Sequence, residues 1–337
     1  MIANHLCNYF KDLEDKAIFA SVLGTDDVQA VESEILQLVK KQFKQDIKKV
    51  LFLIGSIGVV FGFELADGNK IVLKIFSQKI TKQYLDEMHH VLQVLHAEQF
   101  PAPDALSDIF PIFDTYACFY NYISGEHPDA HRPEISRELA KYLAKFVVVV
   151  EKHDLKPMFN FVQQNSKDSF WAEPHNVLFD FAKTHAGSEW IEDKARKARE
   201  VLKQQTGTKM LAHIDWRVEN SYFVDDKLVA VFDWDSLGSM SELELVGRIA
   251  AQFASNFGRS NYKSTPTPEE GRAFVAEYEL YRNKKFNEQE LTIISAAADD
   301  HVAYIARLEH ALDMHKTGQF QLLLRELGDK SFLFARN

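Results

Sequence analysis

Apolar residues recur at two different spacings along the first quarter of the chain. Over residues 1–47 they lie three and four positions apart, as in AIFASVL and VQAVESEILQLVKKQF, which predicts helices. Residues 48–65 and 70–76 are instead rich in β-branched and aromatic residues, and the turn sequence ADGNK lies between them. We therefore expect an N-terminal helical extension, followed by two strands joined by a tight turn.

The helical spacing returns over residues 80–98, and FPAPDAL ends that helix because proline cannot continue it. Two short strands are expected around PIFDTYA and CFYNYISG. From residue 133 onward helices dominate, including a long one from Asn287 to about His315. The only strands expected in this half are NSYFVDD and KLVAVFDW, joined by a turn at Asp225-Asp226.

Together these elements predict an α+β fold with two lobes. A small mixed β-sheet lobe covers residues 48–123, and a larger, mainly helical lobe covers residues 124–337. The length of 337 residues suits two lobes, and 46% hydrophobic and 26% charged residues are ordinary for a soluble globular protein. Apolar runs such as FVVVV are far too short to span a bilayer.

The net charge of −10 argues against nucleic-acid binding, which needs a positive footprint. It is compatible with a cationic substrate. Cys7 and Cys118 are far apart and form no CxxC motif, which favours a reducing compartment. The N-terminal MIANHLCNYFKDLEDK has no basic segment followed by an apolar run, so no signal peptide is predicted. We expect a cytoplasmic protein without membrane or nucleic-acid partners.

The segments HIDWRVEN and VFDWDSL, at residues 213–220 and 231–237, carry the candidate chemistry. They supply Asp215, then Asn220 five positions on, then Asp233 after a short hairpin. Phosphoryl transfer needs one carboxylate to orient the attacking hydroxyl, and oxygen ligands to hold magnesium on the nucleotide phosphates. We predict Asp215 for the first role, and Asn220 and Asp233 for the second.

Neighbouring residues have candidate supporting roles. Arg217 is predicted to contact the transferring phosphate, with an internal salt bridge as the alternative. His213 is predicted to hold the catalytic loop by hydrogen bonds rather than to act as a base. For Asp235 three roles are expected as alternatives: support of the metal site, contact with the substrate, or capping of the helix near Ser241. Trp216 and Trp234 are expected to pack around the loop.

The small lobe holds the candidate nucleotide-binding residues. Lys74, on the returning strand, is predicted to reach the α- and β-phosphates, and Glu87 on the next helix to fix it, with Asp86 as the alternative. GSIGVVFG is not a Walker A loop because no GK[ST] follows. Its Ser56 and nearby amides are expected to cover phosphates, unless the segment is a plain hairpin with valines facing the core.

The junction between the lobes is the expected adenine site. Backbone groups of Asn121, Tyr122 and Ile123 are predicted to bind the base there, an expectation that follows from their order in the chain.

In this order the motifs resemble the aminoglycoside phosphotransferase and choline-kinase-like family, which shares the protein kinase fold. His213, Asp215, Asn220 and Phe232-Asp233-Trp234 match the family's HGD, its Asn five residues on, and its IDW or IDF. FPAP looks like the family's PVP segment, and Ile214 stands where the family usually has Gly. The resemblance implies a base at Asp215, Mg²⁺ at Asn220 and Asp233, and phosphate binding by Lys74.

We therefore predict a small-molecule kinase that uses ATP and Mg²⁺ to phosphorylate a hydroxyl group of an acceptor. The net negative charge is compatible with a cationic acceptor. One alternative is an inactive kinase-like module that binds nucleotide without turnover. A protein kinase is a second alternative, against which stands the lack of an APE-like segment after Asp233. A metal-dependent hydrolase is a third, which the lack of clustered His disfavours.

Overall fold

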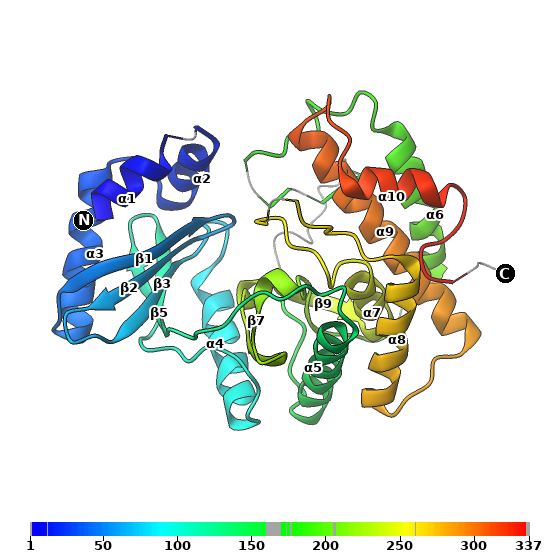
Figure 1. Ribbon diagram of the computed structural model, residues 1–337, viewed down its shortest axis with the longest axis horizontal. Helices are drawn as coiled ribbons and strands as arrows, with labels where there is room; N and C mark the ends of the chain where they lie inside the picture. Colours follow the sequence, from blue (N-terminus) through cyan, green and yellow to red (C-terminus); the bar gives the residue numbers. More distant parts are fainter. Residues whose placement is uncertain are drawn as a thin grey trace. The chain divides into compact units, whose positions relative to one another are not determined.

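The chain forms two compact units (Figure 1). The computed structural model describes residues 2–11, 13–159, 170–172, 174, 175, 177–204, 207–259 and 261–334. Unit 1 comprises Met1–Gln93, Pro103–Ser124 and His175–Leu178. Unit 2 comprises Val94–Ala102, Gly125–Pro174 and Phe179–Asn337. The division falls within helix α4 (Lys82–Ala97).

Unit 1 is built on a five-stranded sheet in the order β1-β2-β3-β5-β4, in which every neighbouring pair is antiparallel. The strands are β1 (Ile47–Gly55), β2 (Val59–Leu65), β3 (Lys70–Ile75), β4 (Phe110–Ile112) and β5 (Thr115–Asn121). Alternation along β3 buries Ile71, Leu73 and Ile75, while Val72 and Lys74 between them are only partly buried. The two faces of this sheet therefore differ in character.

The segment 48–65, which we expected to be one strand, is a hairpin of β1 and β2. The chain reverses at Ser56, whose backbone N–H donates to the Gly58 carbonyl at 2.9 Å. A Cβ on Gly58 would lie 2.5 Å from the carbonyl oxygen of Ile75, so the turn needs a residue without a side chain. Three strands, rather than two, therefore precede α4.

The three N-terminal helices, α1 (Ile2–Tyr9), α2 (Leu13–Leu23) and α3 (Val28–Phe43), pack on one face of this sheet (Figure 1). Val31, Ile35 and Val39 recur every four residues on α3 and are buried, as the sequence pattern predicts. The Asp27 side chain caps α3 by accepting from two backbone N–H groups. The helical extension thus shares one hydrophobic core with the strands.

Unit 2 is mainly helical. Its helices include α5 (Pro133–Lys152), α6 (Glu189–Gln204), α7 (Glu242–Ala250), α8 (Pro268–Arg282), α9 (Glu288–Leu312) and α10 (Gln319–Leu327). Capping boxes at Ser241, Thr267 and Asn287 start α7, α8 and α9. Helix α9 packs against α6, α7 and α10, and a Cβ on Gly247 of α7 would collide with the Ile294 carbonyl of α9.

Two short two-stranded sheets position the motif residues within unit 2. The predicted hairpin is present as β7 (Ser221–Val224) and β8 (Lys227–Val231). The expectation that these are the only strands in this half is wrong, because β6 (Lys209–His213) pairs with β9 (Leu237–Ser241). The β6–β9 pair brackets the hairpin and fixes both ends of the segment 213–237.

Aromatic side chains pack beneath this segment. Trp216 is fully buried and Trp234 nearly so, and both lie near the rings of Phe100 and Phe146. The two tryptophans therefore pack around the loop, as predicted. None of the helices described has the length and apolar character that a bilayer crossing needs.

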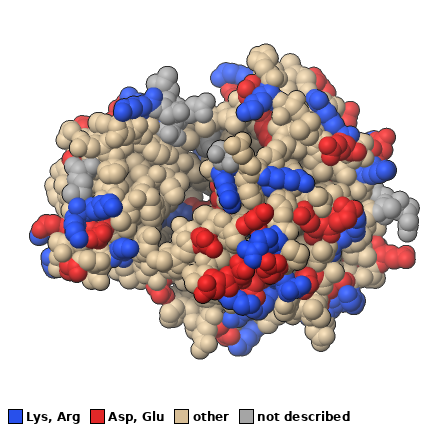
Figure 2. Space-filling model, viewed as in Figure 1, with Lys and Arg blue, Asp and Glu red and all other residues tan. Residues whose placement is uncertain are grey.

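On the face of unit 2 drawn in Figure 2, acidic and basic side chains lie interspersed. Among the described residues of unit 2, Arg132 pairs with both Glu134 and Asp226, and Arg137 pairs with Glu277. Exposed pairs of this kind each stabilise the fold only slightly.

Candidate active site

The β7–β8 hairpin places Asn220 and Asp233 at the same end of its ladder. Ser221 pairs with Val231, and the N–H of Phe232 donates to the carbonyl oxygen of Asn220 at 2.8 Å. Asn220 therefore lies beside the residue that precedes Asp233 in the chain. The hairpin is what brings two residues 13 positions apart together.

Asn220 also contacts Asp215. The Asn220 side-chain N–H₂ donates to the Asp215 carboxylate at 2.8 Å and to the Asp215 carbonyl at 2.9 Å. Since the N–H₂ group donates to Asp215, the side-chain oxygen of Asn220 points away from Asp215 and is available to coordinate a cation. Asp215 remains partly accessible, with 22% of its side chain exposed.

Arg217 bridges two carboxylates of the same loop. It lies 3.1 Å from an Asp215 oxygen and 3.2 Å from a Glu219 oxygen. Its guanidinium also lies over the Phe257 ring, 5.1 Å from the centroid. Glu219 in turn accepts from the backbone N–H groups of Phe257 and Gly258. The internal salt bridge, which was the alternative expected for Arg217, is therefore present. Contact of Arg217 with the transferring phosphate stays a prediction.

His213 is fully buried at the end of β6. Its Nε2 lies 2.9 Å from the Phe232 carbonyl, so this nitrogen carries the proton and donates. Its Nδ1 can then accept from the Ser236 hydroxyl at 3.2 Å. Burial lowers the pKa of His213, which keeps the ring neutral. Both ring nitrogens are thus occupied by hydrogen bonds within the segment, and the loop-holding role of His213 stays a prediction.

Asp233 adopts a left-handed backbone conformation, with φ at 63°. Non-glycine residues rarely do so, although Asp tolerates it better than most. The carbonyl of Asp233 accepts from the Ser236 N–H at 2.9 Å, which closes a short 3₁₀ turn containing Asp235. Asp235 is buried, and the side chain that caps α7 is that of Ser241. Helix capping by Asp235, one of its expected roles, is therefore wrong.

The donor set at Asn220 and Asp233 fits magnesium, which takes few protein ligands and keeps several waters. Both side chains offer hard oxygens, and the committed N–H₂ of Asn220 leaves its oxygen for a cation. Within the described ranges, no cluster of three or more His, Cys, Asp or Glu residues forms a closed metal cage. An open, two-ligand site is the arrangement expected when nucleotide phosphates complete the coordination.

Residues that sequence reasoning missed support Ile214, just before Asp215. The Ile214 carbonyl accepts from Arg248 Nε at 2.7 Å and from the Gln252 side chain at 3.0 Å. The Gln252 oxygen accepts from His301 Nε2 at 2.6 Å. These residues come from α7, the turn after it, and α9, where they fit a helical pattern that gives no sign of a role near the loop.

Lys74 and Glu87, predicted as partners, lie in unit 1. Lys74 pairs in register with Val60 and Cys118 on the sheet face opposite Ile71, Leu73 and Ile75. Its ammonium lies 5.7 Å from the centroid of the Phe76 ring. Glu87 is exposed on α4, and its carboxylate accepts from Gln83 at 2.9 Å. The alternative, Asp86, pairs with Lys82 at 2.7 Å.

The remaining residues predicted to bind nucleotide, Ser56, Asn121 and Ile123, differ in their exposure and in their hydrogen bonds within the protein. Ser56 is exposed in the β1–β2 turn. The N–H of Asn121 donates to Asp104, and the Asn121 side chain exchanges two further bonds with the same residue. In contrast, the N–H of Ile123 makes no backbone hydrogen bond within the described residues. The N–H of Asn121 is thus already bonded, and adenine binding by this segment stays a prediction.

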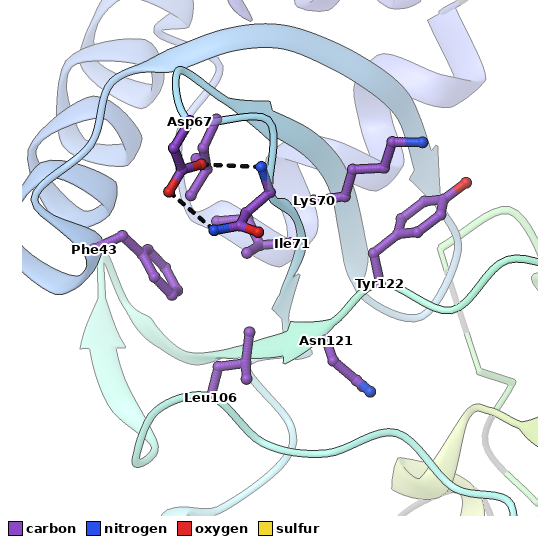
Figure 3. A pocket seen from close by; sticks show the side chains of 9 residues that line it. Phe43, Asp67, Lys70, Ile71, Leu106, Asn121 and Tyr122 are labelled. Atoms are coloured by element: carbon purple, nitrogen blue, oxygen red, sulfur yellow. Dashed lines mark hydrogen bonds between the residues drawn. The ribbon is translucent and has the colours of Figure 1, made fainter.

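A pocket of about 360 Å³ also lies in unit 1 (Figure 3). Phe43, Leu106 and Ile71 line its apolar side, and Asp67 and Asn121 contribute polar groups. Ile71 belongs to the sheet face that packs on α1–α3, opposite the face of Lys74. Lys74 is not among the residues that line this pocket, whereas Lys70, Asn121 and Tyr122 are.

The sequence model of the phosphotransferase enzyme family matches residues 55–241, which is more than half of the chain. The chain belongs to this family. The resemblance to aminoglycoside phosphotransferases and choline kinases is thereby confirmed, and so is the expectation that the protein is a small-molecule kinase. No curated protein sequence matches the chain.

Solved structures show the same fold at low sequence identity. An amicoumacin kinase in complex with AMP-PNP and Ca²⁺ gives a TM-score of 0.60 at 14% identity, covering 88% of this chain and 93% of that one. A spectinomycin phosphotransferase in complex with ADP gives 0.54 at 11%, covering 88% and 94%. An ethanolamine kinase of Plasmodium vivax gives 0.53 at 13%, covering 96% and 92%. The phosphotransferase therefore has the protein-kinase-like α+β fold predicted from its sequence.

Proposed function

We propose that this phosphotransferase moves the γ-phosphate of ATP to a hydroxyl group of a small molecule, with Asp215 as the general base. One observation carries the proposal: the Asn220 amide binds the Asp215 carboxylate, while the hairpin sets Asn220 beside the residue before Asp233. A proton acceptor and a pair of oxygen ligands for a cation are thus built as one unit, which phosphoryl transfer requires.

In the proposed reaction the acceptor hydroxyl gives its proton to the Asp215 carboxylate as its oxygen attacks the γ-phosphorus. A bond forms between that oxygen and phosphorus, and the bond from phosphorus to the bridging oxygen of ADP breaks. Asn220 and Asp233 would hold Mg²⁺, which neutralises charge on the nucleotide phosphates when bound. Arg217 would lie ready to contact the transferring phosphate, while Asp215 and Glu219 hold its guanidinium.

We assign nucleotide binding to unit 1, as the order of its elements suggests. Lys74 would bind the α- and β-phosphates, helped by Glu87, and the backbone around Ser56 would cover them. The backbone of Ile123 would bind the adenine, with Asn121 supporting the junction through its bonds to Asp104. Residues 1–47 would act as a packing extension of this nucleotide-binding lobe, and residues 124–337 as the catalytic and substrate lobe.

The test compares Asp215→Asn with the wild type. Protein is incubated with γ-labelled ATP, magnesium and a small-molecule cell extract, and labelled products are counted. Loss of a general base is expected to lower the transfer rate by roughly 10²–10⁴-fold, while calorimetric binding of AMP-PNP is retained. Asp225→Asn, in the exposed hairpin turn, is the matched control and should transfer at the wild-type rate.

Transfer by Asp215→Asn at the wild-type rate would overturn the proposed mechanism. If the wild type binds AMP-PNP but labels no acceptor and hydrolyses no ATP, the protein is a nucleotide-binding module and not a kinase. Label appearing only in the protein fraction of a whole lysate would instead identify a protein kinase.

A further inference from the structure

Arg248 binds the residue that precedes the proposed catalytic base, Asp215. It forms no ion pair with the described residues. Its Nε donates to the carbonyl oxygen of Ile214 at 2.7 Å, one residue before Asp215. Its terminal nitrogens bond to no group of the described chain, yet they are not fully closed off from solvent. Burial lowers the pKa of this guanidinium. Removing such a group from water without a negative partner is unfavourable.

The terminal nitrogens of the other described arginines of this region have partners within the protein, although the Nε atoms of Arg217 and Arg307 have none among the described residues. Arg217 pairs with Asp215 and Glu219, and Arg199 pairs with Asp300 at 2.7 Å. Arg307, which is fully buried, directs its terminal nitrogens to the Thr184 hydroxyl and the Phe181 carbonyl. Arg248 therefore differs from these arginines, because its terminal nitrogens have no acceptor among the described residues.

Tyr304 provides a second polar group that has no hydrogen-bond partner among the described residues. Its hydroxyl makes no hydrogen bond with any described residue, although the side chain is only partly exposed. Burial raises the pKa of Tyr304, and the charges of Arg248 and Asp215 also act on it. The Tyr304 ring lies 6.3 Å from the ring of His301, which donates to Gln252. The Tyr304 ring lies 6.0 Å from that of Trp171 and 6.5 Å from that of Phe181.

Both groups are held in place relative to Asp215. The Gln252 amide donates to Ile214 O, so its oxygen is left to accept from His301 Nε2. These two hydrogen bonds connect α9 to the proposed catalytic loop. Tyr304 lies one helical turn after His301 on α9. Arg248 binds the same Ile214 carbonyl directly. An acceptor held by Arg248 and Tyr304 would thus be held near Asp215.

We propose that Arg248 and Tyr304 bind an anionic group of the acceptor, a carboxylate or a phosphate, that lies near the hydroxyl to be phosphorylated. This rests on the proposed function and names its substrate class. A guanidinium and a phenol O–H are both donors suited to an oxyanion. The nearby carboxylates Asp215 and Asp300 already have arginine partners, which limits their repulsion of an anion. The net charge of −10 is compatible with a cationic acceptor, and this proposal favours an anionic one instead.

The test measures anion affinity, which does not require the acceptor to be known. Inorganic phosphate and malonate are titrated by calorimetry into protein saturated with AMP-PNP and magnesium, so that the nucleotide site is filled. The wild type should bind one of the two anions more tightly, which tells a phosphate-bearing acceptor from a carboxylic one. Arg248→Gln should weaken that binding by about tenfold to a hundredfold, since it removes charge-assisted bonds.

Three further variants guard the interpretation. Arg325→Gln removes an equal charge from an exposed position on α10 and should leave anion affinity unchanged. Tyr304→Phe keeps the ring and should weaken binding by a few-fold. Arg248→Lys keeps the positive charge but lacks the planar guanidinium, so its anion affinity should lie between those of the wild type and Arg248→Gln. Melting curves and AMP-PNP affinity show whether each variant is folded.

Two results would overturn the anion site: no binding of either anion to the wild type, or equal affinities in Arg248→Gln and Arg325→Gln. Transfer to choline at a rate that Arg248→Gln does not change would also overturn it. Asp215→Asn separates this proposal from the preceding one, because it should keep anion binding and lose transfer. Anion binding without transfer to any acceptor would contradict the proposed kinase function but would support the anion site.

Discussion

The side-chain N–H₂ of Asn220 donates to the carboxylate of Asp215 at 2.8 Å, which couples the proposed metal ligand to the proposed base. The same group also donates to the Asp215 carbonyl at 2.9 Å. One amide therefore fixes both the backbone and the carboxylate of Asp215, and it does so only with its nitrogen turned towards that residue. The role of Asn220 depends on having a donor and an acceptor on one side chain.

Asn220→Asp is expected to abolish this coupling while keeping size and oxygen ligands. A carboxylate at position 220 cannot donate to Asp215 and would repel it, so we expect the transfer rate to fall by roughly 10²-fold or more. Steady-state kinetics with saturating magnesium measure the effect. Asn283→Asp, at the exposed C-cap of α8, is the control and should retain full activity. Near-normal turnover by Asn220→Asp would show that the donated bond is dispensable.

Glu219 offers a second prediction, because it joins Arg217 to the segment 256–259. It pairs with Arg217 and accepts from the N–H groups of Phe257 and Gly258. We expect Glu219→Ala to lower the free energy of unfolding by about 1–3 kcal/mol, since two amides and a guanidinium lose an acceptor. Urea denaturation measures this loss. Glu219→Gln keeps an oxygen acceptor and should recover part of it; equal losses in both variants would assign the effect to the charge alone.

The central motif could be predicted from sequence because its geometry is local. Asp215 and Asn220 lie on one loop, and the turn residues between β7 and β8 mark the hairpin that returns the chain to Asp233. The left-handed conformation at Asp233 gave no comparable signal, since Asp is common in ordinary turns.

The parts that sequence reasoning missed depend on partners distant in the chain. Strand β9 has the sequence LGSMS, which has little β-propensity and is a strand because β6 pairs with it. Arg248 and Tyr304 occupy helices whose apolar pattern explains them without reference to Asp215. Their relation to the loop runs through the Ile214 carbonyl, a backbone atom that no side-chain pattern reveals.

Acid sensitivity is expected from the buried histidines. Burial lowers the pKa of His213 and of His301, and for His301 the positive charges of Arg248 and Arg217 lower it further. Well above pH 6.5, the ordinary pKa of about 6.5 leaves both histidines neutral in the folded and unfolded chains, so they do not affect stability. Below that pH the unfolded chain takes up protons that the folded chain resists, so each histidine lowers stability by up to about 1.4 kcal/mol per pH unit.

Urea denaturation at pH 7.5 and pH 5.5 checks this prediction with His301→Gln. Glutamine can still donate to Gln252 but takes up no proton, so the variant should lose less stability between the two pH values than the wild type. His315→Gln, at an exposed position, should behave as the wild type. An equal loss in wild type and His301→Gln would mean that the acid sensitivity arises elsewhere.

The β1–β2 turn supplies the last prediction. A Cβ at Gly58 would lie 2.5 Å from the Ile75 carbonyl, and because that oxygen belongs to the sheet it cannot easily move. Gly58→Ala should therefore lower the free energy of unfolding by about 1–3 kcal/mol. If the turn covers phosphates as proposed, displacement of Ser56 should also weaken AMP-PNP binding. Urea denaturation and calorimetry measure the two effects separately.

Gly68→Asn is the matched control for Gly58→Ala. Gly68 lies in the β2–β3 turn with φ at 88°, and nothing lies within 4 Å of an added Cβ. Asn tolerates positive φ, so this variant should lose little stability and no AMP-PNP affinity. A Gly58→Ala protein that is destabilised yet binds AMP-PNP normally would separate the two roles. It would show that the glycine serves the close approach of β1–β2 to Ile75, and that the turn contributes nothing to nucleotide binding.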